Sequence, residues 1–390
     1  MDIIYVSSLT EKEKFFDLFK NYDKLPGQQG QKYHRLTAEG IAKNGCKVHA
    51  VTSFPITTEN YSGKYIPASK SICDNVEYNY LPVVNFPLLK NIVIMISSFF
   101  KTLGLIRKNK NCKVICDILN VSVSIGARLA AKLSKTESVG IVTDVPVFLN
   151  NNKKSCLVKI NTKIMNSFDS YVFLTEEMKN VVNSKGKKYI VIEGLVDIDA
   201  VQLDNALDNK YESKVCMYAG MIHKIYGVKY LTEAFLKADI PDAELHIYGK
   251  GDYRNELEEI CKATEKVKYF AERPNEEVVL NQLKATLLIN PRPTNEEYTK
   301  YSFPSKNMEY MVSGTPVLTT KLPGMPKEYY PYVYMIENES VDGLSKNLED
   351  ILTMPKEALH EKGSKAKEWV LENKNNVKQA KKIIEMLERK

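Results

Sequence analysis

The sequence predicts an α/β protein built from two doubly wound domains. Its 390 residues exceed the roughly 250 to 300 that one hydrophobic core usually supports. Short apolar runs typical of buried strands alternate with segments of helical spacing, and this order starts again near residue 214. In each half a glycine-containing segment follows the first strand, at the sheet edge where such domains bind ligands.

The composition indicates a globular protein with an anionic ligand or partner. Hydrophobic residues make up 44% of the chain, and 55 basic residues against 48 acidic ones give a net charge of +7. The charges are interspersed, which fits an anionic substrate or an acidic membrane surface and argues against a nucleic-acid partner. Seven scattered cysteines indicate reduced core residues of a cytoplasmic protein. The chain opens as a strand, so we expect no signal peptide.

The expected domain boundaries follow from a change in pattern. We predict a first domain over residues 1–195, a polar linker over residues 196–213, a second domain over residues 214–372 and an amphipathic terminal helix over residues 373–390. The linker contains Asp197 and Asp199 in a D-x-D pattern. No further ligand residues surround this pair, so no metal site is predicted.

The first domain opens with a strand over residues 3–6, a loop with Gly27 and Gly30, a helix that ends at Gly45 and a strand over residues 47–53. The two loop glycines are candidate ligand-binding positions, although G-x-G-x-x-G is absent. His34, on the helix, is either a functional residue or part of a polar helix face. Asp144 stands at a strand end before Pro146, where α/β enzymes place functional groups.

Residues 92–106 are the most apolar segment of the chain. A membrane-spanning helix needs about 20 apolar residues, so this segment is too short to span. We expect an amphipathic helix that either packs in the core or contacts lipid. Lys108, Lys110 and Lys113 follow it, which keeps the lipid contact open. The first domain is then completed by strands over residues 113–119, 138–146, 171–174 and 189–192 and helices over residues 124–134, 153–166 and 176–183.

The second domain begins with a strand that ends at Gly220 and a helix over residues 230–238. The next strand leads to Gly249 and Gly251, which permit close approach of the backbone to a ligand. Two further strands follow, over residues 266–272 and 285–293, the second of which contains Arg292 at its end.

Residues 301–320, YSFPSKNMEYMVSGTPVLTT, combine a helix start with a carboxylate one turn later. Ser302 is the expected N-cap, and Gly314 ends the helix before a buried strand. Free N–H groups around Pro304 to Lys306 attract phosphate, and Glu309 points back toward them. This pair fits a ribose attached to a diphosphate, so the segment predicts a nucleotide ligand.

Together these segments resemble the family 4 retaining glycosyltransferases of GT-B fold, in particular bacterial members that build capsule, O-antigen or exopolysaccharide. The resemblance is carried by NPRPTNEEYTKYSFPSKNMEYMVSGTPVL, YAGMIHKIYGVKYLTEAF, IYGKGDYRNEL and FDSYVFLTEEM. It implies two Rossmann-like domains facing across a cleft, the first for the acceptor and the second for a nucleotide-sugar donor. It implies no metal and no cofactor, a glycan or lipid-linked saccharide acceptor, and a place in the cytoplasm or at the inner face of the membrane.

Members of this family carry an E-x7-E motif, whose first glutamate contacts the transferred sugar and whose second contacts the donor ribose. Glu309 matches the second glutamate, and Tyr301 stands at the position of the first, in a register fixed by Phe303. Glu296 or Glu297 could substitute from the preceding loop.

The resemblance assigns a role to each candidate residue. Lys224 and Arg292 would neutralise the diphosphate, since Met221 and Tyr226 stand where the family has its arginine and lysine. The N-terminal candidates for the acceptor are the Gly27 to Gly30 loop, His34 and Asp144. The donor-binding candidates are Gly220, Gly249, Gly251, Tyr301, Phe303, Pro304, Ser305, Lys306 and Glu309. Two alternatives stay open. One is a nucleotide-sugar epimerase of the same fold, and the other is a donor-binding but inactive subunit of a polysaccharide assembly, which Tyr301 makes less remote.

Overall fold

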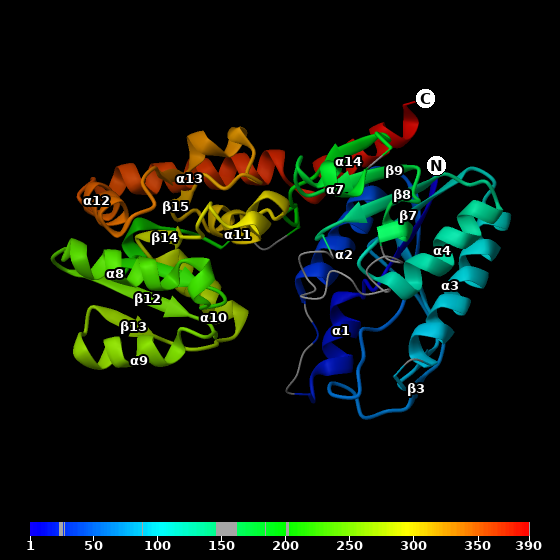
Figure 1. Cartoon of the computed structure of the whole chain (residues 1–390), viewed down its shortest axis with the longest axis horizontal. Helices are drawn as coiled ribbons and strands as arrows, with labels where there is room; N and C mark the ends of the chain where they lie inside the picture. The colour runs from blue at the N-terminus through cyan, green and yellow to red at the C-terminus, as the bar shows by residue number, and fades with distance from the viewer. Residues whose placement is uncertain are drawn as a thin grey trace. The chain divides into compact units, whose positions relative to one another are not determined.

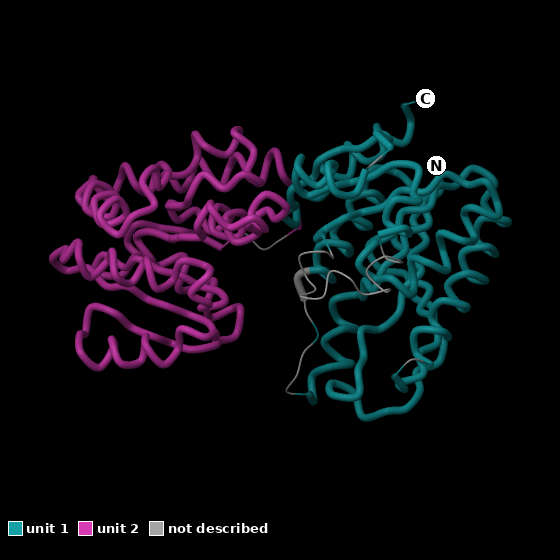
Figure 2. The backbone as a smooth tube through the Cα atoms, in the orientation of Figure 1, with its two compact units in different colours: residues 1–198, 375–390 teal, residues 199–374 magenta. Residues whose placement is uncertain are grey.

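The computed structural model describes residues 1–22, 26, 28–87, 89–145, 162–183, 185–199 and 203–389. It contains two compact units, residues 1–198 with 375–390 and residues 199–374 (Figure 2). The boundary between the two units lies within the linker predicted over residues 196–213. Residues 203–213 of that predicted linker belong to the second unit. Asn205 Nδ2 donates to Ser313 O at 2.7 Å, and Lys210 Nζ donates to the carbonyls of Leu283 and Ala285.

The core of the first unit is an eight-stranded sheet in the order β10-β9-β8-β7-β1-β2-β5-β4. Figure 1 labels its strands β7, β8 and β9. Neighbouring strands are parallel, except that β4 is antiparallel to β5 at one edge. The strands are β1 (Asp2–Ser7), β2 (Lys47–Thr52), β4 (Ser69–Cys73), β5 (Val76–Tyr80), β7 (Cys112–Asp117), β8 (Ser138–Val142), β9 (Ser170–Phe173) and β10 (Tyr189–Val191). A separate antiparallel pair joins β3 (Tyr65–Ile66) and β6 (Val83–Val84). Strands β3 to β6 were not predicted. They have five residues or fewer, and the alternation of Val76, Tyr78 and Tyr80 with polar residues in β5 was the signal that was missed.

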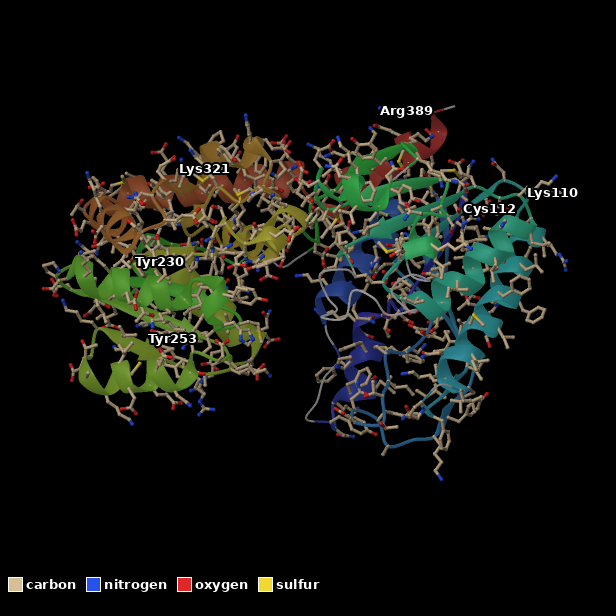
Figure 3. The ribbon with its side chains drawn as sticks, viewed as in Figure 1. Lys110, Cys112, Tyr230, Tyr253, Lys321 and Arg389 are labelled. Carbon is tan, nitrogen blue, oxygen red and sulfur yellow. The ribbon has the colours of Figure 1, made fainter. Side chains whose placement is uncertain are left out.

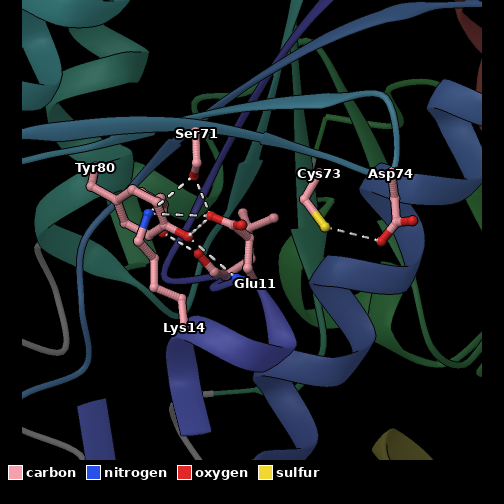
Figure 4. Close-up of polar contacts among 8 residues, drawn as sticks. Glu11, Lys14, Ser71, Cys73, Asp74 and Tyr80 are labelled. Carbon is pink, nitrogen blue, oxygen red and sulfur yellow. Dashed lines mark hydrogen bonds and ion pairs between the residues drawn. The ribbon is translucent and has the colours of Figure 1, made fainter. Parts of the chain in front are cut away.

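The helices of the first unit are α1 (Lys12–Phe19), α2 (Gln28–Lys43), α3 (Leu89–Lys108), α4 (Val121–Leu133) and α7 (Met178–Val182). A polar cluster attaches the start of α1 to the edge of the sheet (Figure 4). The Glu11 carboxylate accepts hydrogen bonds from Tyr80 Oη at 2.9 Å, from Lys14 Nζ at 3.4 Å and from the Ser71 hydroxyl. The helix predicted over residues 153–166 lies largely outside the described residues.

The terminal helix α14 (Asn376–Glu388) is amphipathic, as predicted, and buries Ala380, Ile383 and Leu387. It belongs to the first unit, where it packs on α2. A Cβ on Gly40 of α2 would lie 2.2 Å from Asn376 O, and Asn44 Nδ2 donates to Val377 O at 2.9 Å. The close approach of two helix backbones requires the glycine.

The second unit is built on a six-stranded parallel sheet in the order β13-β12-β11-β14-β15-β16. Its strands are β11 (Lys214–Ala219), β12 (Ala243–Tyr248), β13 (Val267–Tyr269), β14 (Leu287–Asn290), β15 (Val317–Thr320) and β16 (Tyr334–Ile336). Its α-helices are α8 (Val228–Ala238), α9 (Arg254–Ala263), α10 (Asn275–Lys284), α11 (Ser305–Ser313), α12 (Val341–Leu352) and α13 (Lys356–Asn373). Short 3-10 helices cover Leu207–Asn209 (η1), Lys224–Tyr226 (η2), Glu297–Tyr301 (η3) and Lys327–Tyr332 (η4). Apolar side chains from β11, β12, β14 and the helices that flank them form one continuous core.

Candidate functional site

The strand order of the second unit has a switch point between β11 and β14. From β11 the chain proceeds outward to β12 and β13, and from β14 it proceeds the other way to β15 and β16. The loops that follow these two strands therefore leave the sheet in opposite directions, and the space between them is where doubly wound domains bind ligands. Gly220 follows β11 and Arg292 follows β14, so two predicted residues lie at this edge.

Helix α11 is fixed to this edge by two buried side chains that sequence reasoning missed. Tyr310 Oη accepts a hydrogen bond from Ala219 N at 2.9 Å and donates to Ala219 O at 3.2 Å. Asn307 accepts from Asn290 Nδ2 at 2.8 Å and donates to Thr319 Oγ1 at 3.2 Å. Neither side chain is accessible to solvent. Asn307 and Tyr310 each precede a buried methionine of α11, and a polar group beside these apolar residues was the available signal.

The start of α11 carries unsatisfied backbone donors. Pro304 is the N-cap, without a side-chain cap, so the prediction of Ser302 as N-cap was wrong. Ser302 instead ends η3, because the chain turns through Phe303 and Pro304 before the helix begins. The N–H groups of Ser305 and Lys306 have no intrahelical partner. They and the positive end of the helix dipole form a place for an anion.

The Lys306 side chain extends from this helix start across Gly220. A Cβ on Gly220 would lie 1.9 Å from Lys306 Cε and 2.3 Å from Nζ, so a larger residue would displace the lysine. Within the described chain the ammonium group has no hydrogen bond and no ion pair. Burial lowers the pKa of Lys306, and the charge of Arg292 lowers it further, whereas Glu309 acts in the opposite direction.

Arg292 is the second cation at the edge. Its guanidinium carbon lies 5.1 Å from the centre of the Tyr226 ring and 5.6 Å from that of Tyr298. Its Nη1 is 3.5 Å from Ser302 Oγ, and its Nε is buried without a hydrogen-bond partner among the described residues. Lys306 and Arg292 thus form a pair of cations that influence each other and that no described carboxylate neutralises through an ion pair.

Glu309 lies one turn after Ser305 on α11 and is exposed. The helix therefore presents an exposed carboxylate one turn after its start, and the contact of Glu309 with a donor ribose stays a prediction. Phe303 is buried against Tyr329, with ring centres 5.4 Å apart. Tyr301 is half-buried at the end of η3, and Glu297 is exposed at its beginning.

The other predicted residues of this unit are placed differently. Lys224 was expected to neutralise a diphosphate, but its ammonium group pairs with Glu256 of α9, which also contacts Lys229 at 3.5 Å. This happens because η2 lies beside the start of α9. Gly249 and Gly251 serve packing between turns, since a Cβ on Gly249 would lie 1.8 Å from Gly220 O and one on Gly251 would lie 2.5 Å from Ile222 C.

In the first unit, His34 belongs to a buried polar network at the corresponding switch point between β1 and β7. Its Nε2 lies 3.2 Å from Asp117 Oδ2, and its Nδ1 lies 2.8 Å from Tyr5 Oη. Ser7 Oγ donates to Asp117 Oδ2 at 2.8 Å. Although burial opposes ionisation of Asp117, the charge of His34 and hydrogen bonds from His34, Ser7 and Leu119 N hold the pKa of the carboxyl below its usual value. With 2% of its surface exposed, His34 is neither a residue of a polar surface face nor an open ligand contact.

Two of the remaining predicted residues of the first unit, Gly30 and Asp144, are among the described residues. Gly30 was predicted to lie in a loop before the helix, but α2 begins at Gln28, so Gly30 lies inside its first turn. Gly27 lies outside the described residues. Asp144 follows β8, where its carboxylate accepts a hydrogen bond from Val145 N at 2.8 Å and burial raises its pKa. Among the described residues, no group of three histidine, cysteine, aspartate or glutamate side chains could hold a metal ion.

Comparison with known proteins finds a family similar in sequence to the second unit. Residues 202–369 match the family described as glycosyl transferases group 1. No curated protein matches the chain.

Solved structures resemble the whole chain in fold at low sequence identity. Sucrose-phosphate synthase from Thermosynechococcus elongatus is 14% identical, with 99% of this chain and 98% of that chain covered and a TM-score of 0.64. HepE from Anabaena in complex with UDP-glucose is 14% identical, with 99% of each chain covered and a TM-score of 0.62. The lipopolysaccharide outer core galactosyltransferase WaaB is also 14% identical, with the same coverage and TM-score.

These structures confirm the predicted α/β class and its two Rossmann-like domains. The family match over residues 202–369 and the fold shared over the whole chain together support a GT-B glycosyltransferase.

Proposed function

We propose that this chain is a retaining, metal-independent glycosyltransferase of surface polysaccharide biosynthesis. It would move a sugar from a nucleotide-sugar donor in the second unit to a glycan or lipid-linked saccharide acceptor bound by the first unit. The observation that carries the proposal is the pair of cations, Lys306 and Arg292, at the start of α11, with Glu309 one helical turn away. The free cysteines among the described residues fit a reducing compartment such as the cytoplasm.

The chemistry of sugar transfer explains why these residue types are needed. The transition state resembles an oxocarbenium ion, and the departing nucleoside diphosphate gains negative charge. Lys306, Arg292 and the N–H groups of Ser305 and Lys306 would stabilise that charge. The hydrogen bonds of the buried Tyr310 to Ala219 hold α11, which carries Lys306 and the two N–H groups, at this edge of the sheet. Because the two side chains can supply the positive charge, the proposal assigns no metal ion.

Glu309 would accept hydrogen bonds from the two ribose hydroxyls of the donor. Glu297 is the residue that we propose in place of the glutamate absent at Tyr301, since it is the exposed carboxylate at the start of the same 3-10 helix. HepE is described in complex with UDP and with UDP-glucose, so uridine nucleotides are the first donors to test.

The test is a transfer assay with a panel of nucleotide sugars, in the presence and absence of saccharide acceptors. We expect release of nucleoside diphosphate only with an acceptor, and an anomeric configuration in the product, read by NMR, that matches the donor. Glu309→Gln should weaken donor binding by about 10- to 150-fold, because hydrogen bonds to a charged group contribute about 1.5 to 3 kcal/mol. Glu357→Gln, an exposed carboxylate on α13, is the matched control.

Three outcomes would contradict the proposal. Conversion of the donor without any acceptor would identify an epimerase. Donor binding without turnover across the panel would identify an inactive subunit. Equal donor affinity for Glu309→Gln and the unsubstituted protein would remove the role assigned to Glu309.

A further inference from the structure

Helix α3 has one side in the core and one side in solvent. Ile94, Leu103 and Ile106 are buried, and Ser98 Oγ donates to Val123 O of α4 at 2.7 Å. The two helices approach so closely that a Cβ on Gly126 would lie 2.2 Å from Met95 O. With 20 residues, α3 is longer than the apolar segment of residues 92–106, which was predicted to be too short to span a membrane. By length and composition α3 is the helix of the described chain that could cross a membrane, but this packing commits one side of it to the first unit.

The opposite side of α3 exposes a row of large apolar side chains. Leu89, Ile92, Ile96 and Phe100 are 48%, 50%, 48% and 65% exposed. Their spacing of three, four and four residues places them along one line of the helix, which we call the α3 stripe. Single exposed apolar residues are ordinary, but four in one row form a continuous patch that water solvates poorly. The neighbouring helix α4 adds Leu129 and Leu133, which are 51% and 65% exposed.

The charges around the α3 stripe are almost all positive. Arg107 lies seven residues after Phe100 and therefore on the same side of the helix, and Lys108 and Lys110 follow it. All three are exposed, and Lys110 is at the outer edge of the first unit (Figure 3). None of the three forms an ion pair with a described residue. Residues 89–135 contain nine lysines and arginines and one acidic residue, the buried Asp117.

We propose that the α3 stripe docks parallel to the surface of a lipid bilayer that contains anionic phospholipid. Amphipathic helices bind this way, with the apolar side at the boundary between headgroups and acyl chains and the basic side chains at the phosphates. The choice of lipid over protein follows from the charge, because every exposed charge within residues 89–135 is a cation, which matches a uniformly anionic plane. The carboxylates that approach this segment from elsewhere, Glu77 and Glu137, are half-buried and already paired with basic side chains. The docking surface lies in the first unit, so the inference does not depend on the proposed activity.

Vesicle flotation of the full chain tests the proposal without any donor or acceptor. Vesicles of phosphatidylcholine alone are compared with vesicles that contain about one third phosphatidylglycerol, at low and high salt. We expect binding to the anionic vesicles that weakens as salt rises. Each basic residue near an anionic surface contributes about five-fold in affinity, so Arg107→Glu with Lys108→Glu should weaken binding by at least about 25-fold.

The matched control for charge is Lys381→Glu with Lys382→Glu, two exposed lysines of α14 in the same unit, and it should bind much better than the α3 variant. Ile96→Ser with Phe100→Ser should weaken binding at least ten-fold, whereas Leu280→Ser, an exposed apolar residue of the second unit, should leave it unchanged. All of these side chains are exposed, and an unchanged thermal unfolding midpoint verifies that each variant is folded.

The proposal is overturned if the protein does not float with anionic vesicles, or if the α3 variants float as well as their controls. A concentration-dependent dimer in sedimentation velocity that Ile96→Ser with Phe100→Ser abolishes would assign the stripe to a second copy of the chain. Donor binding measured on the same samples separates this result from a failure of the proposed transferase function.

Discussion

Replacement of Lys306 by methionine should improve the stability of the second unit and impair its binding of a nucleoside diphosphate. The Lys306 side chain is half-buried over Gly220, and burial and then the charge of Arg292 lower its pKa. The ammonium group has no ion-pair partner among the described residues. Such an arrangement costs stability when the site is empty, since two like charges lie near each other and are partly removed from bulk water. A diphosphate would neutralise both of them.

The expected magnitudes follow from these contacts. A hydrogen bond between a charged donor and a phosphate contributes about 1.5 to 3 kcal/mol, which corresponds to about 10- to 150-fold in Kd. Lys306→Met should weaken binding of UDP by a factor in this range. The same change should raise the free energy of unfolding by about 1 kcal/mol, the size typical of relieving an unfavourable charge.

Isothermal titration calorimetry with UDP and urea unfolding measure the two effects on the same protein. Lys346→Met, an exposed lysine on α12, is the control and should change neither quantity by more than about 0.5 kcal/mol. Unchanged UDP affinity of Lys306→Met would refute the placement of the diphosphate. A loss of stability would refute the argument that the charge is unfavourable in the empty site.

The stability gain of Lys306→Met should depend on pH. In the folded protein the pKa of Lys306 is lowered, by burial and then by Arg292, from its ordinary value of 10.5. The folded state therefore binds the proton more weakly than the unfolded state. The gain is fully present at neutral pH, decreases as pH rises past the folded-state pKa and disappears near pH 10.5.

Two further substitutions test the buried contacts of each unit. Asp117→Asn should lower the free energy of unfolding of the first unit by about 3 kcal/mol, because it leaves His34 without its charged partner. Since the pKa of Asp117 is lowered on folding, this difference should persist above pH about 4 in urea unfolding and shrink as the solution is acidified; a constant difference down to pH 2 would contradict the pairing. Tyr310→Phe should cost the second unit about 1 to 3 kcal/mol, because the N–H and carbonyl groups of Ala219 lose their partner. Tyr230→Phe is the control for this change (Tyr230 is labelled in Figure 3), because the Tyr230 hydroxyl is buried with no hydrogen-bond partner among the described residues. Its removal should not destabilise the second unit. Equal effects of the two substitutions on the free energy of unfolding would refute the role of Tyr310.

The features that sequence alone determined are those set by neighbouring residues. Alternating apolar runs and helical spacing identified the two α/β domains, and Gly314 and Gly45 marked helix ends where the backbone adopts a left-handed conformation. The apolar spacing of α14 and the carboxylate of Glu309 after the start of α11 were likewise local patterns. The periodicity of a helix or a strand arises within a few residues, so it can be recognised in the sequence without knowledge of the fold.

Only the tertiary structure decided which side chains meet. Lys224 and Lys306 were both plausible cations, but η2 directs Lys224 to Glu256, whereas α11 directs Lys306 across Gly220. His34 is buried because β1 and β7 are neighbours in the sheet, which brings Asp117 to it from a distant part of the sequence. The position of a charged group relative to others depends on strand order and on which helix side is covered, and one sequence carries no direct signal for either. For the same reason, the apolar segment around α3 could be read from the sequence, but its division into a core side and an exposed stripe could not.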